Sequence, residues 1–277
     1  MYLPPQTDFD LDRIAESGQC FRWEAVEENG YRIPFRDKCL LIRRRADGRM
    51  ELDCSDAEFQ AVWRNYFDLD TDYAGLRDQV DPDQDPFLFR AIEAERGIRI
   101  LRQDPWETLI SFIISQNRNI PAIRRSVELL CRAAGESLTD RRGQEFYAFP
   151  APESILRLDD ADLDTCRLGY RGKYVRAAAR AVAGGDLRLE DLAAAAEEET
   201  LAALTGLYGV GVKVASCVSL FGLHHLDAFP VDVWIRRVLE AEYPGGYPRE
   251  RYSPYNGVYQ QYMFACYRNQ GKEKDHG

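Results

Sequence analysis

The sequence lacks most of the groups that mark a metal centre. Histidine occurs only three times in 277 residues, and no two of the seven cysteines are closer together than Cys39 and Cys54. Close cysteine pairs such as CxxC, which bind zinc or iron–sulfur clusters, are therefore absent. Free thiols spaced in this way predict a protein of a reducing compartment, the cytoplasm.

Membrane and secretion signals are missing as well. No apolar run approaches the ~20 residues that span a bilayer. The N-terminal segment MYLPPQTDFDLDRIAESG is acidic and lacks the apolar stretch of a signal peptide. We therefore expect no membrane partner and only a short leader before the folded part.

Positive charge is scarce, because 36 Lys and Arg residues oppose 46 Asp and Glu residues, for a net charge of −10. Phosphate binding requires cations, so the total favours an acidic helical protein unrelated to DNA. Two segments differ from the total: residues 165–181 contain five cations and no anion, and residues 117–132 contain four arginines and one glutamate. Charge alone favours a solvated helix face for each.

What the sequence does contain is a globular composition, with 45% hydrophobic and 30% charged residues. Apolar and polar positions alternate within the first 55 residues, and Gly30 and Gly48 lie in turn signals between the alternating stretches. Short connections of this kind predict an antiparallel sheet. The expected strands cover residues 19–26, 30–37, 39–45 and 49–54.

From Asp56 onward the apolar spacing becomes helical. Ser55 and Glu58 have the spacing of a capping box at the first helix. The expected helices cover residues 55–67, 104–116, 119–135, 170–185, 189–204, 213–222, 231–243 and 253–269, and residues 271–277 are expected to fray. The sequence thus predicts an α+β fold, with a sheet domain and flanking helices at residues 1–95 and a helical domain at residues 96–277.

The most informative stretch is the glycine-rich segment LTGLYGVGVKVASC at residues 204–217. A P-loop would need lysine directly after glycine, but Val212 separates Gly211 from Lys213, and a dinucleotide-binding fingerprint would need glycine where Val214 stands. The remaining motif is a helix-hairpin-helix, whose backbone amides can hold a DNA phosphate. Taken alone, a glycine-rich turn between helices is more often only a turn.

Lys213 and Asp232 can supply chemistry next to this turn. The ordinary interpretation of Lys213 is a surface lysine, and the alternative is a buried amine that is kept neutral as a nucleophile. Asp232 follows Pro230 and precedes a helix, so its ordinary interpretation is an N-cap. A carboxylate fixed at such a place can also stabilise positive charge on a sugar.

In combination, these residues resemble a known family. Lys213 followed by the Pro230–Asp232 segment is similar to the helix-hairpin-helix DNA glycosylases that have a Gly/Pro-rich loop and an aspartate. Further segments narrow the resemblance to the 8-oxoguanine DNA glycosylase/AP lyase family, as a prokaryotic-type member. They are GQCFRW at 18–23, SQNRNI at 115–120, LGYRGKY at 168–174 and GVYQQYMF at 257–264, in the family's order.

The resemblance implies a bifunctional enzyme of base excision repair. It would flip 8-oxoguanine out of duplex DNA, because C1′ and the base edges are blocked inside the stack. Lys213 would attack C1′ and form a Schiff base, and Asp232 would stabilise the oxocarbenium-like sugar. Strand cleavage by β-elimination would follow.

The same resemblance implies a base pocket in a cleft between helical lobes. The main-chain carbonyl of Gly18 would accept a hydrogen bond from N7–H of the lesion, which guanine lacks. Cys217 and Phe264 would sandwich the base, and Gln260 would bond its Watson–Crick edge. The ordinary alternatives are a core position for Cys217 and Phe264 and a solvent-facing position for Gln260.

The implied DNA contacts lie on other segments. Tyr170 would wedge into the gap, and Asn117 and Arg171 would hold the orphaned cytosine, although Tyr170 and Arg171 could also be an ordinary surface pair. Hairpin backbone groups would hold a DNA phosphate at Gly209, Gly211 and Val212. Hairpin carbonyls would hold a structural K⁺, Na⁺, Mg²⁺ or Ca²⁺ at Thr205, Leu207 and Val210.

Apart from such a cation, the resemblance implies no organic cofactor and no iron–sulfur cluster. The implied partner is double-stranded DNA that contains 8-oxoguanine, and the single-lesion task suggests a monomer. Two alternatives remain open: a monofunctional glycosylase for another damaged purine, against which Lys213 argues, and a non-catalytic helix-hairpin-helix DNA-binding protein, which would need neither Lys213 nor Asp232.

Two positions depart from the family pattern. Ala122 stands where eukaryotic members have an arginine that contacts the opposite cytosine, so we expect weaker discrimination of the opposite base. Trp234 stands where histidine is common, which leaves the adjacent phosphate contact unassigned.

Overall fold

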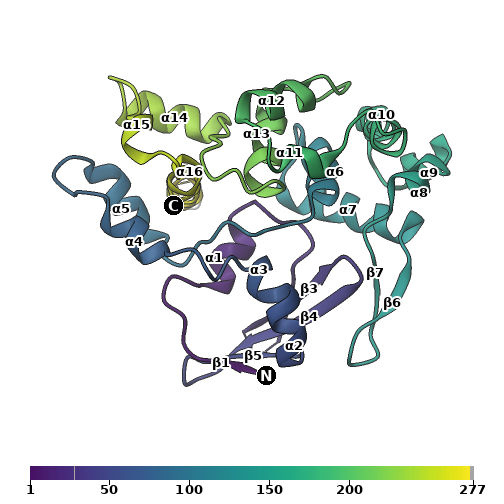
Figure 1. The fold of residues 1–277 in the computed structure, drawn as a ribbon, viewed down its shortest axis with the longest axis horizontal. Helices are drawn as coiled ribbons and strands as arrows, with labels where there is room; N and C mark the ends of the chain where they lie inside the picture. The colour runs from purple at the N-terminus through teal and green to yellow at the C-terminus, as the bar shows by residue number, and fades with distance from the viewer. Residues whose placement is uncertain (28, 275–277) are drawn as a thin grey trace.

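The computed structural model describes residues 1–27 and 29–274, with the side chains of residues 272–274 left out, and it confirms the predicted α+β fold. A five-stranded antiparallel sheet has the order β1-β5-β4-β3-β2. Its strands are β1 (Tyr2–Leu3), β2 (Glu24–Val26), β3 (Gly30–Phe35), β4 (Lys38–Arg44) and β5 (Met50–Leu52). The remainder is mostly helical, and most of its helices lie above the sheet in Figure 1.

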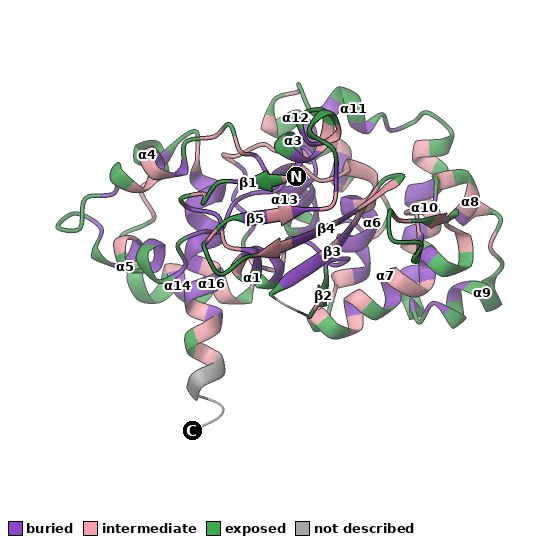
Figure 2. Cartoon of the chain, turned by 90° about the horizontal axis from the view of Figure 1, so that it is seen from below, coloured by how far each residue is buried: buried purple, intermediate pink, exposed green. Residues whose placement is uncertain are grey.

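The sheet buries one face under short helices. In the register of β3 and β4, Tyr31 pairs with Ile42 and Ile33 pairs with Leu40, and these side chains are buried. Figure 2 shows the buried stretches along these two strands. The covering elements are α1 (Leu11–Glu16), the π-helical turn η1 (Phe59–Trp63) and α3 (Arg64–Tyr66), and α2 (Asp56–Glu58), which has no buried residue, leads into η1.

The start of this helical run differs in detail from the expected capping box. Ser55 accepts a hydrogen bond from the backbone N–H of Glu58, as predicted. The Glu58 carboxylate instead accepts from Trp63 Nε1 and from Arg141, so it is not available to the backbone N–H of Ser55. Only one of the two hydrogen bonds of a capping box is therefore formed here.

The first predicted strand is wrong over residues 19–23, which form an irregular segment before β2. The apolar residues that suggested a strand are buried, but they are divided between the core of the sheet and the core of the helices. Cys20 and Trp23 pack into the core of the sheet, and Phe21 packs into the core of the helices. Arg22 is buried and donates to Glu107 Oε2 at 3.2 Å.

The helical body surrounds the adjacent helices α6 and α13. Its elements are α4 (Tyr73–Asp78), α5 (Pro86–Ala94), α6 (Pro105–Ser115), α7 (Ile120–Ala134), α8 (Pro152–Leu156), α9 (Asp160–Thr165), the 3₁₀ turn η2 (Gly169–Arg171), α10 (Gly172–Ala183), α11 (Leu189–Leu192), α12 (Glu197–Thr205), α13 (Val212–Phe221), α14 (Val233–Glu242), α15 (Arg249–Tyr252) and α16 (Asn256–Lys274). Side chains of α4 and α5 pack into the core of the helices, although both helices lie before residue 96. The division of the chain between residues 95 and 96 stays a prediction. No helix in the described ranges is long and apolar enough to cross a membrane.

Two of the predicted helices have different bounds. The helix expected over residues 189–204 is broken between α11 and α12, where the carbonyls of Leu192 and Ala193 accept from Thr200 Oγ1 and His225 Nε2. The C-terminal helix continues to Lys274, through four of the residues expected to fray. The rest of that expected tail, residues 275–277, lies outside the described residues.

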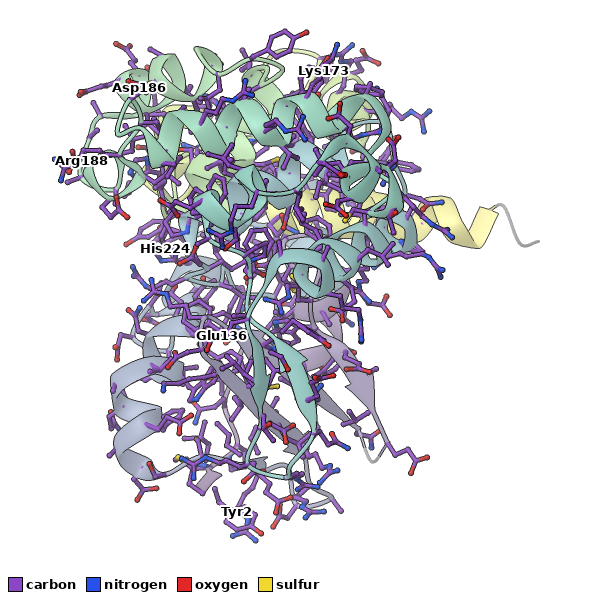
Figure 3. The ribbon with its side chains drawn as sticks, turned by 90° about the vertical axis from the view of Figure 1, so that its right-hand side faces the viewer. Tyr2, Glu136, Lys173, Asp186, Arg188 and His224 are labelled. Atoms are coloured by element: carbon purple, nitrogen blue, oxygen red, sulfur yellow. The ribbon has the colours of Figure 1, made fainter. Side chains whose placement is uncertain are left out.

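A hairpin that the sequence did not reveal joins the helical body to the sheet. Its strands are β6 (Ser137–Thr139) and β7 (Glu145–Tyr147), and Figure 3 shows it extending from Glu136 down beside the sheet. Ion pairs hold it there: Arg32 with Asp140 at 2.9 Å, Arg141 with Glu58 at 2.6 Å and Arg142 with Asp53 at 3.3 Å. These contacts connect the helical body to the sheet and to the helical run that follows β5.

Candidate active site

The glycine-rich turn connects α12 to α13 and requires glycine at one position. Gly209 has φ +85°, and a Cβ there would lie 2.3 Å from the ring of Tyr174. Its carbonyl accepts from Gln116 Nε2 at 3.1 Å, which ties the turn to the end of α6. Gly211 is the N-cap residue of α13, and no side chain caps that helix. The predicted helix-hairpin-helix is therefore present as a structure.

Lys213 lies in the first turn of α13 and is exposed. The alternative of a buried lysine is wrong, because the side chain is exposed; the amine lies over the ring of Phe112, with Nζ 5.4 Å from the ring centre. The thiol of Cys217 lies beside the amine, one turn further along α13. Burial raises the pKa of Cys217, and the Lys213 charge opposes that shift.

Asp232 is the N-cap residue of α14, as its ordinary interpretation predicted. Its Oδ1 accepts from the backbone N–H groups of Trp234 and Ile235, at 2.9 Å each. The same carboxylate lines a cavity with Lys213. The helix start therefore holds a half-buried carboxylate in a fixed place near the amine.

That cavity collects the residues expected at the base pocket. It has a volume of about 60 Å³ and opens beside a cleft of about 620 Å³, and Phe112 lines both spaces. The expected residues that line the narrow cavity are Gly18, Lys213, Cys217, Asp232, Gln260 and Phe264. They come from the loop after α1 and from α13, α14 and α16.

Gln260 has an unpaired acceptor in this cavity. The residue is 3% exposed, so the solvent-facing alternative is wrong. Its Nε2 donates to the carbonyl of Pro230 at 2.9 Å, which fixes the amide, and its Oε1 is buried without a hydrogen-bond partner in the described structure. A buried acceptor of this kind is costly unless a ligand supplies a donor.

Side chains from elsewhere hold the loop around Gly18 through the main-chain carbonyls of the residues next to Gly18. Arg268 donates to the carbonyl of Glu16, Gln261 donates to that of Ser17 at 2.6 Å, and Gln103 donates to that of Gln19 at 2.8 Å. Within the described residues no hydrogen bond reaches the carbonyl of Gly18. Gly18 has φ +82°, a conformation that favours glycine.

The residues expected to contact the opposite base lie together at the ends of α6 and η2. Asn117, in a left-handed conformation with φ +52°, donates to the hydroxyl of Tyr170 at 3.0 Å. Tyr170 is 46% exposed. Arg171 is buried, its guanidinium lies 4.3 Å from the ring centre of Tyr170, and its Nε donates to the carbonyl of Gln116 at 2.7 Å. The alternative of an ordinary surface pair therefore fails for Arg171.

The hairpin carbonyls expected to hold a cation differ in their bonding. The carbonyl of Leu207 accepts from the N–H of Val210 at 3.1 Å, whereas no hydrogen bond to those of Thr205 and Val210 occurs among the described residues. In the described part of the chain, no three His, Cys, Asp or Glu side chains gather as a metal site. Any cation here would thus rely on main-chain oxygens.

Several side chains near the site were not foreseen. Phe112 lines both the cavity and the cleft, but a phenylalanine within an apolar helix gives no signal of its own. Tyr208 in the hairpin and Val231 and Val233 on either side of Asp232 are exposed, as are the expected Tyr170 and Val212. Exposed apolar side chains that gather on one surface are typical of a binding site, and their exposure can be seen only in the structure.

Two family models match consecutive parts of the chain. The model of the 8-oxoguanine DNA glycosylase N-terminal domain matches residues 1–109, and that of the HhH-GPD superfamily of base excision DNA repair proteins matches residues 110–244. The N-glycosylase/DNA lyase of Saccharomyces cerevisiae is 32% identical over 86% of this chain and 69% of the yeast protein.

Solved structures are similar over almost the whole chain. MBOgg1 with a low-affinity DNA ligand has a TM-score of 0.91 at 36% identity, covering 98% of this chain and 96% of that one. The Clostridium acetobutylicum 8-oxoguanine glycosylase/lyase, bound to duplex DNA with cytosine opposite 8-oxoguanine, has a TM-score of 0.90 at 32% identity, covering 98% and 95%. The chain thus belongs to the 8-oxoguanine DNA glycosylase family of the HhH-GPD superfamily.

Proposed function

We propose that this protein is an 8-oxoguanine DNA glycosylase and DNA lyase in which Lys213 is the nucleophile. The observation that carries the proposal is the gathering of an amine, a carboxylate, an unpaired amide oxygen and an aromatic ring around one cavity. A non-catalytic DNA-binding hairpin would need none of these groups in one place. The enzyme works as a monomer and needs no organic cofactor, and its free cysteines suit the cytoplasm.

The chemistry begins with the flipped nucleotide in the cleft. The amine of Lys213 attacks C1′, the bond from C1′ to N9 breaks, and the base leaves with the bonding electrons and takes up the proton that the amine releases. Asp232 stabilises the positive charge that develops on the sugar, and its fixed position at the start of α14 means that little reorganisation is needed. Opening of the sugar ring gives a Schiff base, and loss of the C2′ proton expels the 3′ phosphate.

The base is read from two sides. The carbonyl of Gly18 accepts from N7–H of 8-oxoguanine, and guanine would leave this acceptor unpaired at a cost of ~1–3 kcal/mol. The free Oε1 of Gln260 accepts from the Watson–Crick edge. Cys217 and Phe264 enclose the ring. These roles are assigned from the family resemblance and supported by the shared cavity.

The duplex is bound by the surface around the cleft. Tyr170 enters the gap, Asn117 and Arg171 hold the opposite cytosine, and the amides at Gly209, Gly211 and Val212 bind a phosphate. A hard cation suits main-chain oxygens, so K⁺, Na⁺, Mg²⁺ or Ca²⁺ would be held by the carbonyls at Thr205, Leu207 and Val210. Its charge would help to hold the phosphate at the hairpin.

Borohydride trapping tests the proposal. Wild type and the Lys213→Gln variant are mixed with a duplex that carries 8-oxoguanine opposite cytosine, reduced and run on a denaturing gel. We expect a covalent adduct with wild type and none with the variant. Lys173→Gln is the matched control, because Lys173 is an exposed lysine near the hairpin that lies beside Tyr174 and Tyr208 instead of in the cavity; it should give the adduct.

Other outcomes separate the alternatives. Excision without an adduct would identify a monofunctional glycosylase, and binding without excision would identify a DNA-binding module. A protein that does not bind DNA at any salt concentration would contradict the proposal altogether.

A further inference from the structure

Arg268, four residues after Phe264 on α16, is a buried cation with N–H groups that have no partner. The residue is 7% exposed. One terminal nitrogen, Nη2, donates to the carbonyl of Glu16, but Nε and Nη1 are buried without a hydrogen-bond partner in the described structure. Burial lowers the pKa of Arg268 because the charge is desolvated. Unpaired donors on a buried cation are costly, so they point to a ligand that brings an acceptor.

The guanidinium lies beside the two groups assigned to the lesion. Its central carbon is 5.3 Å from the ring centre of Phe264. Nη1 lies 3.7 Å from the position that a Cβ on Gly18 would take. Arg268 also lines the wide cleft together with Lys213 and Asp232.

The chemistry of the lesion identifies the missing acceptor. 8-Oxoguanine differs from guanine at two neighbouring atoms, because N7 carries a hydrogen and C8 carries an oxygen. A carbonyl such as that of Gly18 can recognise only the hydrogen. The oxygen needs a donor, and a guanidinium has donors only.

We propose that Arg268 is a specificity-determining residue that donates a hydrogen bond from Nη1 to the C8 oxygen of the flipped lesion. The inference rests on the proposed function and adds a second reading of the oxidised edge. A water takes about 30 Å³ in the liquid, so the cavity of about 60 Å³ does not hold a purine. Entry of the base therefore requires the lining of this cavity to open, and the Phe264 ring, which is part of that lining, lies over the guanidinium in the free protein.

Single-turnover excision of 8-oxoguanine and of 8-thioguanine from the same duplex tests the inference. The sulfur analogue keeps N7–H but replaces the C8 oxygen with a weak acceptor. Wild type should excise 8-oxoguanine roughly 10- to 100-fold faster, which is the worth of a hydrogen bond to a charged group. Arg268→Met should bring this ratio close to one, and Arg268→Lys, which keeps one charged donor, should give an intermediate ratio.

Arg124→Met is the matched control. Arg124 lines the same cleft, donates to the carbonyl of Ala15 at 2.8 Å and has a buried, unpaired Nε, but it lies on α7, whereas the Arg268 guanidinium lies beside Phe264 and Gly18. Its substitution should leave the ratio of the two excision rates unchanged.

Two results would overturn the inference. Equal slowing of both substrates in Arg268→Met would mean that the side chain only supports Phe264 and the loop at Glu16. Equal rates of 8-oxoguanine and 8-thioguanine excision by wild type would also overturn it, and this result does not depend on whether the variants fold. Failure of wild type to excise either base would instead overturn the proposed function.

Discussion

The amide of Asn117 donates a 3.0 Å hydrogen bond to the hydroxyl of Tyr170, across 53 positions of sequence. The residue proposed to enter the duplex is thereby held by a residue proposed to contact the opposite base. Arg171, directly after Tyr170, is held by the carbonyl of Gln116. In the free protein the groups that would replace the extruded nucleotide are already assembled at the end of α6 and in η2.

Ala122 makes a prediction about the opposite base. Its backbone N–H is capped by Asn119, but its side chain has no donor for cytosine, so wild type should excise 8-oxoguanine opposite all four bases with modest preference. Ala122→Arg should raise the preference for cytosine about 10-fold or more, as a charged hydrogen bond does. Excision rates opposite each base measure this. Ala133→Arg, at the other end of α7, should change nothing, and a strict cytosine requirement in wild type would refute the idea.

Asp232→Asn should separate catalysis from folding. Asparagine caps a helix nearly as well as aspartate, so the free energy of unfolding should change by less than about 1 kcal/mol. Excision should slow by roughly 10²–10³-fold, because the charge that stabilises the sugar is lost. Asp159→Asn makes the same change at the capping box of α9, away from the cleft, and should leave excision intact. Equal slowing in the two variants would contradict the assignment.

Gly209 and Gly211 should respond differently to alanine. A Cβ at Gly209 would lie 2.3 Å from the Tyr174 ring in a left-handed conformation, whereas one at Gly211 would meet nothing within 4 Å. Gly209→Ala should therefore lower the free energy of unfolding by about 2–4 kcal/mol, and Gly211→Ala by about 0.5 kcal/mol or less. Urea unfolding measures both; similar losses would mean that the turn does not depend on this close approach.

Asp68 predicts a pH dependence of stability. Burial by itself would raise the pKa of Asp68, but the neighbouring His224, whose Nε2 lies 3.2 Å from Oδ1, together with Thr71 and the charge of Arg102, lowers it to about 2. The pKa of an aspartate in the unfolded chain is about 3.9. The ionised carboxylate therefore contributes roughly 2–3 kcal/mol to the free energy of unfolding above that pH, and this contribution is lost as the pH falls toward 2.

Urea unfolding of wild type and Asp68→Asn between pH 7 and pH 3 checks this. The difference between the two proteins should be largest at pH 7 and should shrink below about pH 4. Asp70→Asn removes a carboxylate that is 68% exposed and paired with Arg64, so it should cost about 0.5 kcal/mol or less. A difference that stays constant down to pH 3 would exclude this role for Asp68.

The fold class and most long helices could be predicted because their periodicity is local. The irregular path of residues 19–23 could not, because two cores mimic the alternation of a strand there. The break between α11 and α12 depends on His225, 32 positions after the carbonyl it binds, so propensity alone favoured one helix. The β6–β7 hairpin was missed because its short strands depend on ion pairs with residues 32, 53 and 58.

The candidate site was predicted through the resemblance, and the structure adds its physical state. Sequence spacing could place Lys213 beside a helix start, but it could not tell exposure from burial, which depends on how α6 and α14 pack around α13. The unpaired atoms of Gln260 and Arg268 likewise have no signal in the sequence. Burial without a partner is a property of three-dimensional packing alone.

The hydrogen bonds around Gly18 also bear on how relatives could come to differ in the lesions they accept. Every amino acid has a main-chain carbonyl, so substitution at position 18 cannot delete the acceptor; it can only misplace it. The placement is determined by side chains from elsewhere, Gln261 and Arg268 on α16 and Gln103 before α6. Relatives that accept different lesions should therefore differ at those three positions, whereas the loop around Gly18 should stay the same.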